Sequence, residues 1–335
     1  MKKKTKRALT ALTGASMILS AATAQAEEIE TSIHQELSVT EGTAAEFTKL
    51  ANVEGAFAFN QTRVTPPDEA FNLFGTVVTG ACAKPAFAVD TDEANYFINV
   101  GGKVKQAYTI NVREMDDAQK NTIGLCSCAT GPASANLQIT GVRLEDVLSL
   151  AQIDEYVNTV TVRGADGYAV SLPLSYALSN KAMIVYQVGG QDMPYGTQFW
   201  VPSTVAKYFT RNVVDIELSV SEQEVEVETR ADELKAEVAI MNYTDGAIFT
   251  SGQEITFEGY ADDLGSPITA VEFSMDGGET WTAYETQDAT ADKWVYWNYT
   301  ITAGDAGDYQ LAVRARTANG TVSPLSAKLN FSVAQ

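Results

Sequence analysis

The last hundred or so residues carry the pattern that most constrains the fold of this chain. From residue 237 to the end, six or seven short runs of β-branched and aromatic residues follow one another, separated by turn residues. Asp276-Gly277-Gly278 stands between two runs and supplies the positive φ of a tight hairpin. So many short strands predict an immunoglobulin-like β-sandwich, although none of the chain's cysteines falls within it. Its core is expected to depend on aromatic side chains, with Trp281, Trp294 and Trp297 as candidates.

Residues 71–219 are organised differently, as short strands, long loops and little helix. Gly101-Gly102 separates two strand-like runs and predicts a hairpin. The run "TIGLCSC" (122–128) predicts a buried strand, and residues 140–153 have the apolar spacing of an amphipathic helix with acids in its first turn. Because no regular strand–helix–strand repeat occurs, the expected fold class is α+β.

Two further segments flank this domain. Residues 27–70 are polar and acidic, and we expect a partly ordered leader there. Residues 220–236, "VSEQEVEVETRADELKA", are charge-dense and lack a core pattern, which predicts a linker to the sandwich at 237–335.

The first 26 residues have the composition of a signal peptide. Five cationic residues and no acid precede an apolar run that ends in Ala24-Gln25-Ala26, a small-x-small cleavage site. Its removal would leave 18 Lys and Arg against 43 Asp and Glu, a formal charge of −25 in place of −20. So acidic a chain is not expected to bind nucleic acid. Because of the signal peptide, we expect the protein in the periplasm, in the cell envelope or secreted. Lys6-Arg7 also occupies the place of the arginine pair in a twin-arginine export signal, with lysine instead of the first arginine. The sequence therefore allows either the twin-arginine pathway or the general secretory pathway.

The three cysteines are too few for a disulfide framework in an exported chain of this length. Cys126 and Cys128 are one residue apart, and a disulfide between them would close a small, strained ring. With His34 as the only histidine, a structural zinc site is not expected. One thiolate could still serve a metal that brings its other ligands with it, although composition alone would equally allow two inert buried thiols.

The order of motifs resembles the sulfite oxidase family of molybdopterin enzymes over about residues 94–335. In order, the matching segments are "YFINVGGKVKQAYTINVREM", "GLCSCATG", "ITGVRLEDVLSLA", "YGTQFWVPSTVAKYFTRNVVDIEL" and "AVEFSMDGGETWTAYE" with "KWVYWNYTI". The closing motif of the family is "G-x-P-x-R-l-v-v-P-G-x-x-G-x-x-x-v-K-W-l-x-x-I-e-l". The resemblance implies a molybdopterin-binding domain followed by an immunoglobulin-like domain.

The resemblance also implies a cofactor, molybdenum bound to molybdopterin, and the residues that hold it. The pterin supplies two sulfurs and the protein one thiolate. Cys128, followed by a small residue as in the family, is favoured over Cys126 as this metal ligand and catalytic residue. Lys207 corresponds to the lysine of the closing motif and would contact the anionic pterin, with Ser203 and Thr204 as further donors.

Departures from the family pattern bear on the substrate. Sulfite-oxidising members continue their cysteine as "C-A-G-N-R-R", whereas this chain continues "C-A-T-G-P", and Gln198 stands at the arginine position of the closing motif. An oxyanion needs fixed positive charge, so we expect oxygen-atom transfer with a small neutral S- or N-oxide rather than sulfite, although Arg143, Arg163 and Arg211 could still point inward.

The resemblance and the sequence together also predict binding partners. The sequence has no haem or iron–sulfur ligand pattern, so a separate electron-transfer protein or a quinol-linked partner is expected, and a homodimer through the C-terminal domain is compatible with the family. The alternative is a cell-envelope binding module that keeps the two-domain scaffold without metal, because fold does not fix function.

Overall fold

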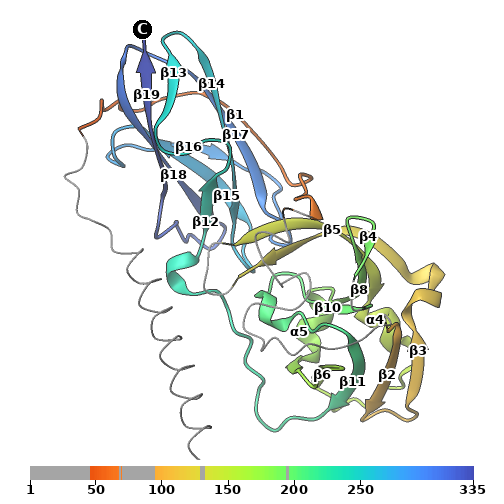
Figure 1. Ribbon diagram of the computed structural model, residues 1–335. Coiled ribbons are helices and arrows are strands. Elements are labelled where there is room, and N and C mark those ends of the chain that lie inside the picture. Colours follow the sequence, from red (N-terminus) through yellow and green to blue (C-terminus); the bar gives the residue numbers. More distant parts are fainter. Residues whose placement is uncertain (1–45, 68, 70–94, 129–132, 194–195) are drawn as a thin grey trace, which may run out of the picture. The chain divides into compact units, whose positions relative to one another are not determined.

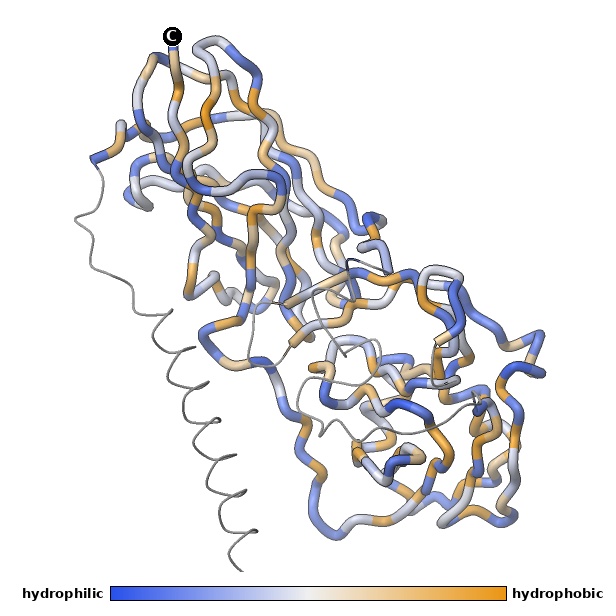
Figure 2. The backbone as a smooth tube through the Cα atoms, in the orientation of Figure 1, coloured by the Kyte–Doolittle hydropathy of each residue, from blue (hydrophilic) through white to orange (hydrophobic). Residues whose placement is uncertain are grey.

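The structure is a computed structural model that describes residues 46–67, 69, 95–128, 133–193 and 196–335 (Figure 1). Residues Thr48–Gln335 form one compact unit. The expected signal peptide, the cleavage site, His34 and the third cysteine, Cys82, lie outside the described residues. Figure 2 shows apolar residues alternating with polar ones along the strands, as a sheet with one buried face requires.

The first sheet of the domain between residues 95 and 219 joins distant parts of the chain in the order β3-β2-β11-β6-β7. Strand β11 pairs in parallel with β2, and the other pairs in this sheet are antiparallel. Gly102 has a φ of +83°, and a Cβ there would stand 2.1 Å from the carbonyl oxygen of Leu218, so glycine is required where β2 ends. The strands are β2 (Phe97–Gly102), β3 (Tyr108–Asn111), β6 (Thr159–Gly164), β7 (Ala169–Pro173) and β11 (Val213–Ser219). The predicted hairpin between β2 and β3 is confirmed, but its connection is residues 103–107, because Gly101 and Gly102 still belong to β2 and pair with β11.

The second sheet carries the cysteines and has the order β10-β8-β5-β4, with β9 paired to β8. Its strands are β4 (Gln119–Ser127), β5 (Ser134–Arg143), β8 (Met183–Val188), β9 (Gln191–Asp192) and β10 (Gln198–Trp200). Strands β4 and β10 lie three positions apart, roughly 14 Å in a flat sheet. Yet the Trp200 ring lies 3.4 Å from where a Cβ on Gly124 would stand. The sheet is therefore strongly curved, with Trp200 and Gly124 on its inner side.

Helices are short in this domain. They are α4 (Leu144–Val147), which continues into the 3-10 helix Leu148–Leu150, and α5 (Leu174–Ser179). The helix predicted over 140–153 was wrong at its start, because β5 runs to Arg143 and pairs with β8. Gly141 makes this possible, since a Cβ there would stand 2.1 Å from the carbonyl oxygen of Ile184. The domain is mostly β, so the α+β class holds only loosely.

The C-terminal residues form a sandwich of two sheets around an aromatic core. One sheet has the order β1-β17-β14-β12 and the other β13-β19-β18-β15-β16. Between them, Phe273 stacks on Tyr299 with ring centroids 3.9 Å apart, and Trp297 is fully buried. The strands are β1 (Ala56–Asn60), β12 (Glu237–Ile240), β13 (Ala247–Thr250), β14 (Glu254–Asp262), β15 (Ile268–Ser274), β16 (Thr282–Glu285), β17 (Val295–Thr302), β18 (Gly307–Thr317) and β19 (Ala327–Ala334).

Three features of the sandwich differ from what the sequence suggests. Strand β1 comes from the segment 27–70 that the sequence assigns to an acidic leader, and it pairs with β17. Trp294 is buried, but it packs with the core of the preceding domain and stacks on Tyr260. Trp281 is only half-buried, and the guanidinium of Arg314 lies 4.0 Å from its ring centroid. Of the three tryptophans, Trp297 alone belongs to the sandwich core.

Candidate functional site

The two cysteines differ in their position on strand β4. Cys126 lies inside the strand opposite Ala135 and is fully buried. Cys128 lies one residue beyond the strand and is half-buried, and its backbone N–H donates to the carbonyl of Ala133 at 2.9 Å. Residues 129–132, which follow the cysteine in the motif, lie outside the described part of the chain. Cys128 is thus held at its backbone while its side chain keeps some access.

Alternation along β4 places Gly124, Cys126 and Cys128 on one face of the sheet. The position of the Trp200 ring against Gly124 identifies this as the inner, curved face. Cys126 is part of the apolar core there. A ligand for a metal that is not part of the chain must be reachable, so the geometry favours Cys128 over Cys126 for this role.

Gln198, at the arginine position of the closing motif, serves as a neutral bridge. Its Oε1 accepts a hydrogen bond of 2.9 Å from the indole N–H of Trp200, and its Nε2 donates to the carbonyl of Phe209 at 3.4 Å. Trp200 and Phe209 are stacked with ring centroids 4.7 Å apart. The side chain that replaces the motif arginine is therefore used to hold an aromatic pair beside the cysteine strand.

The donors predicted in the closing loop have partners within the chain. The hydroxyl of Thr204 donates to the carbonyl of Val201 at 2.6 Å and is buried. Ser203 has a φ of +63°, and its carbonyl accepts from the hydroxyl of Tyr176 at 3.5 Å. Lys207, in the 3-10 helix Ala206–Tyr208, forms an ion pair with Glu228 and is partly exposed. Their roles toward a cofactor stay predictions.

Arg211, named above only as an arginine that could point inward, is the residue that the spacing of the closing motif identifies. The motif lysine stands five residues before the isoleucine of "I-e-l", and that count back from Ile216 reaches Arg211, not Lys207. Arg211 is 7% exposed, and its Nε lies 3.2 Å from Oδ2 of the buried carboxylate of Asp166. This arginine is therefore a better-buried cation than Lys207.

The residues on either side of Arg211 carry buried polar atoms without a hydrogen-bond partner. These atoms are the hydroxyl oxygen of Thr210 and Oδ1 of Asn212. Buried polar groups are almost always paired, so each such exception needs a reason. The backbone N–H of Phe199 donates to the carbonyl of Thr210, which joins this segment to strand β10 and so to the inner face of the cysteine sheet.

These residues fit the expected cofactor. A half-buried thiol suits a soft metal centre, and a buried cation between unpartnered oxygens suits the polar, anionic pterin. Cys128 would hold the metal, and Arg211, Thr210 and Asn212 would contact the pterin.

The other two arginines that could have supplied positive charge are occupied elsewhere. Nη1 of Arg143 donates to the carbonyl of Lys181 at 2.7 Å, and Nη2 of Arg163 lies 3.7 Å from a carboxylate oxygen of Glu217, with both side chains half-exposed. Of the three, Arg211 is the one that points into the domain.

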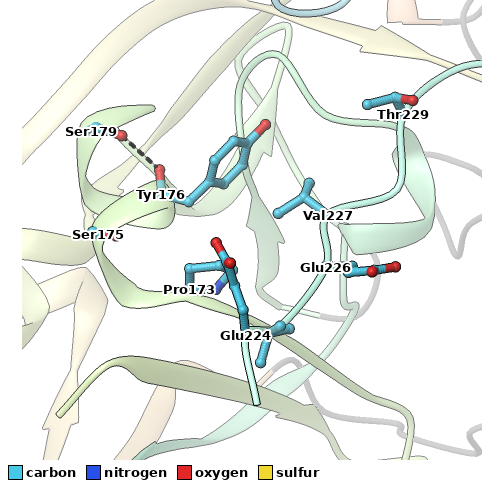
Figure 3. A pocket seen from close by; sticks show the side chains of 9 residues that line it. Pro173, Ser175, Tyr176, Ser179, Glu224, Glu226, Val227 and Thr229 are labelled. Carbon is cyan, nitrogen blue, oxygen red and sulfur yellow. Dashed lines mark hydrogen bonds between the residues drawn. The ribbon is translucent and has the colours of Figure 1, made fainter. Parts of the chain in front are cut away.

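A groove on the same domain is not lined by Cys128. It has a volume of about 870 Å³ and lies between α5 and the residues that follow β11 (Figure 3). Tyr176 faces Val227 across it, and Glu224 and Glu226 line its acidic side. We assign the chemistry to the cysteine strand instead, because the groove offers no group that could bind a soft metal.

No helix among the described residues is long and apolar enough to cross a membrane.

Comparison with known proteins gives a family match for each of the two domains. Residues 85–226 match the family described as the oxidoreductase molybdopterin binding domain, and residues 237–313 match the bacterial Ig domain. Mitochondrial sulfite oxidases of Mus musculus and Homo sapiens are 26% and 27% identical to the chain over 259 residues. Each alignment covers 67% of this chain and 47% of the relative, so the chain spans about half the length of these curated relatives.

A solved structure shares the fold. The sulfane dehydrogenase SoxCD from Paracoccus pantotrophus superposes with a TM-score of 0.56 at 15% sequence identity, covering 85% of this chain and 88% of that one. The likeness extends over both domains of the chain, and at this identity it concerns the fold alone.

Proposed function

Because the chain belongs to the sulfite oxidase family, with a molybdopterin-binding domain followed by an immunoglobulin-like domain, we propose that it is an exported oxidoreductase that uses molybdenum bound to molybdopterin. Its reaction is oxygen-atom transfer to or from a small S- or N-oxide. The observation that carries the proposal is Cys128, a half-buried thiol at the end of strand β4 on the inner face of a curved sheet.

The residues of the chain contribute binding and orientation. When bound, the cofactor would supply the two-electron oxygen-atom exchange. Cys128 would anchor the metal. The hydrogen bond from its backbone N–H to the carbonyl of Ala133 fixes the position of the backbone that carries the thiol. Arg211 would balance the negative charge of the pterin, and Trp200 with Phe209 would exclude water from the inner face of the sheet.

Electrostatics support a neutral substrate. Gln198 provides no charge where the family motif has arginine, and Arg143 and Arg163 are held by partners within the chain. Arg211 is paired with Asp166 and would contact the pterin, so it would not be left for an anionic substrate. An anion such as sulfite would therefore meet little uncompensated positive charge on a chain whose formal charge is −20.

Substitution of each cysteine tests the metal assignment. Cys128→Ser should abolish molybdenum binding and redox activity, whereas Cys126→Ser should retain both. The protein is produced in a host that makes the cofactor, and molybdenum per chain is measured by elemental analysis. Metal loss in Cys126→Ser alone would transfer the ligand role to Cys126. A wild-type protein without molybdenum would instead support the metal-free binding module.

Steady-state kinetics test the substrate. Neutral sulfoxides and amine N-oxides should be reduced when an artificial electron donor is supplied, and sulfite oxidation should be weak or absent. Efficient sulfite turnover that falls with rising salt would contradict the proposal, because it would show an anion site that the described residues do not explain.

Export and electron supply are part of the same proposal. If the cofactor is inserted before export, Arg7→Lys should trap precursor in the cytoplasm, and unchanged export of active enzyme would argue against the twin-arginine route. Electrons would come from a separate electron-transfer protein or a quinol-linked partner, which co-purification with the exported protein should recover.

A further inference from the structure

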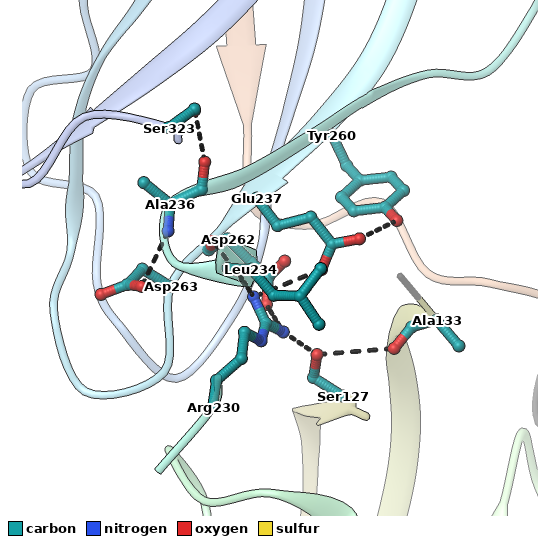
Figure 4. Close-up of polar contacts among 10 residues, drawn as sticks. All are labelled: Ser127, Ala133, Arg230, Leu234, Ala236, Glu237, Tyr260, Asp262, Asp263 and Ser323. Atoms are coloured by element: carbon teal, nitrogen blue, oxygen red, sulfur yellow. Dashed lines mark hydrogen bonds and ion pairs between the residues drawn. The ribbon is translucent and has the colours of Figure 1, made fainter. Parts of the chain in front are cut away.

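A buried arginine joins the segment after β11 to the cysteine strand. Arg230 lies within residues 220–236, which the sequence assigns to a linker, yet it is only 3% exposed. Figure 4 shows its guanidinium between the end of β14 and the end of β4. A charge that is taken out of water in this way needs several partners.

On one side, Arg230 is bound by residues of the sandwich. Nη2 lies 2.8 Å from Oδ2 of Asp262, at the end of β14, and Nη1 lies 3.3 Å from Oε2 of Glu237, at the start of β12. The hydroxyl of Tyr260 donates to Oε1 of the same glutamate at 3.3 Å. Two strands of the sandwich therefore fix the guanidinium.

On the other side, Arg230 contacts the residue between the two cysteines. Its Nη2 donates to the hydroxyl oxygen of Ser127, which is fully buried. The Ser127 hydroxyl donates to the carbonyl of Ala133 at 3.5 Å, and that carbonyl also accepts the backbone N–H of Cys128 at 2.9 Å. The last residue of β4 and the residue before β5 are thus tied together.

This geometry links the sandwich to Cys128 through few bonds. Ser127 precedes Cys128 directly, so any movement of the Ser127 backbone also moves the Cα and Cβ atoms of Cys128. The arginine reaches Ser127 from the face of β4 opposite to the thiols, because neighbouring residues of a strand point to opposite faces. It therefore braces the strand without occupying the thiol side.

We propose that Arg230 is a positioning residue for Cys128, through which the immunoglobulin-like domain holds the end of the cysteine strand. The role of Cys128 as metal ligand rests on the proposed function, whereas the bracing of its thiol does not. The position of the thiol can therefore be tested without the metal.

The test measures how fast each cysteine of the cofactor-free protein is alkylated by iodoacetamide, with peptide mass spectrometry as the readout. Cys126 is fully buried and reacts when the domain opens, so it serves as the internal reference. Arg230→Met should raise the rate at Cys128 about tenfold or more relative to Cys126. Ser127→Ala should do the same, although it leaves Arg230 paired with Asp262 and Glu237.

The matched control is Arg314→Met. Arg314 also pairs with a buried carboxylate of the sandwich, Glu272, but has no contact with β4 among the described residues. Its substitution should leave the ratio of the two rates unchanged. The proposal is overturned if Arg230→Met raises both rates equally, which would make the arginine a general stabiliser, or changes neither. Because the protein in this assay holds no cofactor, a failure to bind molybdenum would not affect the result.

Discussion

The two domains of the chain differ in how they satisfy buried polar atoms. In the sandwich, the buried oxygens without a hydrogen bond belong to Glu237, Asp262 and Glu272, whose carboxylates are all held by arginine ion pairs. Among the described residues of the sandwich, the indole N–H of Trp297 is the one neutral buried group without a partner. Between residues 95 and 219, the corresponding atoms among the described residues are neutral. They are the side-chain oxygens of Ser134, Tyr186, Thr210 and Asn212.

The difference indicates which domain is complete by itself. A carboxylate that pairs with an arginine is compensated in part by charge, so its unbonded oxygen does not call for a ligand. A neutral hydroxyl or amide oxygen that is buried without a partner only loses its contacts with water. The sandwich is therefore built as a structural unit, whereas the first domain has the polar interior of a unit that binds a polar cofactor.

The largest expected effect tests the self-sufficiency of the sandwich. Trp297 is fully buried and packs edge-on against Phe273 with centroids 5.3 Å apart, so Trp297→Ala should lower the free energy of unfolding by about 3–5 kcal/mol. The half-buried Trp281 provides the control, and its alanine variant should lose about 1 kcal/mol. Urea denaturation measures both, and equal losses would contradict the placement of the core.

A second effect concerns the charged interior of the sandwich. Burial, together with the nearby carboxylate of Asp262, raises the pKa of Glu237 to about 7 from 4.5, although Arg230 and the hydrogen bond from Tyr260 oppose the shift. The native state therefore keeps this proton when the unfolded chain has released it. The free energy of unfolding should consequently fall as the pH rises from about 4.5 to about 7.

Glu237→Gln tests this pH dependence. Glutamine carries no charge at any pH, so the variant should be more stable than wild type above pH 7, by an amount on the order of 3 kcal/mol, and similar near pH 4.5. Thermal unfolding across this pH range supplies the measurement. If Glu237→Gln instead lowers the stability at pH 8, the attraction of the Glu237 carboxylate to Arg230 outweighs the cost of burying it.

A smaller effect concerns the neutral interior of the first domain. Thr210→Val replaces a buried hydroxyl that has no partner, and should leave the cofactor-free protein equally stable or up to about 1 kcal/mol more stable. Thr197→Val is the matched control, because that hydroxyl accepts the N–H of Val213 at 3.1 Å, and it should cost about 1 kcal/mol. Urea denaturation of the two variants gives the comparison, and a destabilising Thr210→Val would mean that its hydroxyl is satisfied within the chain.

Local sequence signals predicted the elements that depend on local contacts. The buried strand at 122–128 and the hairpin of β2 with β3 follow from alternation and glycine, and both are present, although the turn follows Gly102 instead of lying at Gly101-Gly102. The start of the helix at 140–153 was wrong because residues 140–143 satisfy helical spacing and strand pairing equally, and only the pairing of β5 with β8 decides between them.

Long-range contacts explain what the sequence left out of the candidate site. Arg230 lies in a charge-dense segment that predicts an exposed linker, and its burial depends on Asp262 and Ser127, which are distant in the chain. Trp294 was predicted to lie in the sandwich core, yet its backbone N–H donates to Asn136 of β5. Arg211 could have been predicted from the sequence as the counterpart of the motif lysine, because the closing motif fixes the spacing of that lysine from Ile216.

The smallest expected effect on stability distinguishes the two cations proposed for the pterin. Lys207 and Glu228 are 36% and 49% exposed at their side chains, so removing the pair as Lys207→Gln with Glu228→Gln should change the free energy of unfolding by less than about 1 kcal/mol. Molybdenum content should also stay near that of wild type. The matched double variant, Asp166→Asn with Arg211→Met, removes the buried pair without leaving a lone charge, and it should lose most of the molybdenum. If Lys207 is instead the cation that holds the pterin, elemental analysis will show the opposite order, because the exposed pair would then open toward the cofactor when it binds.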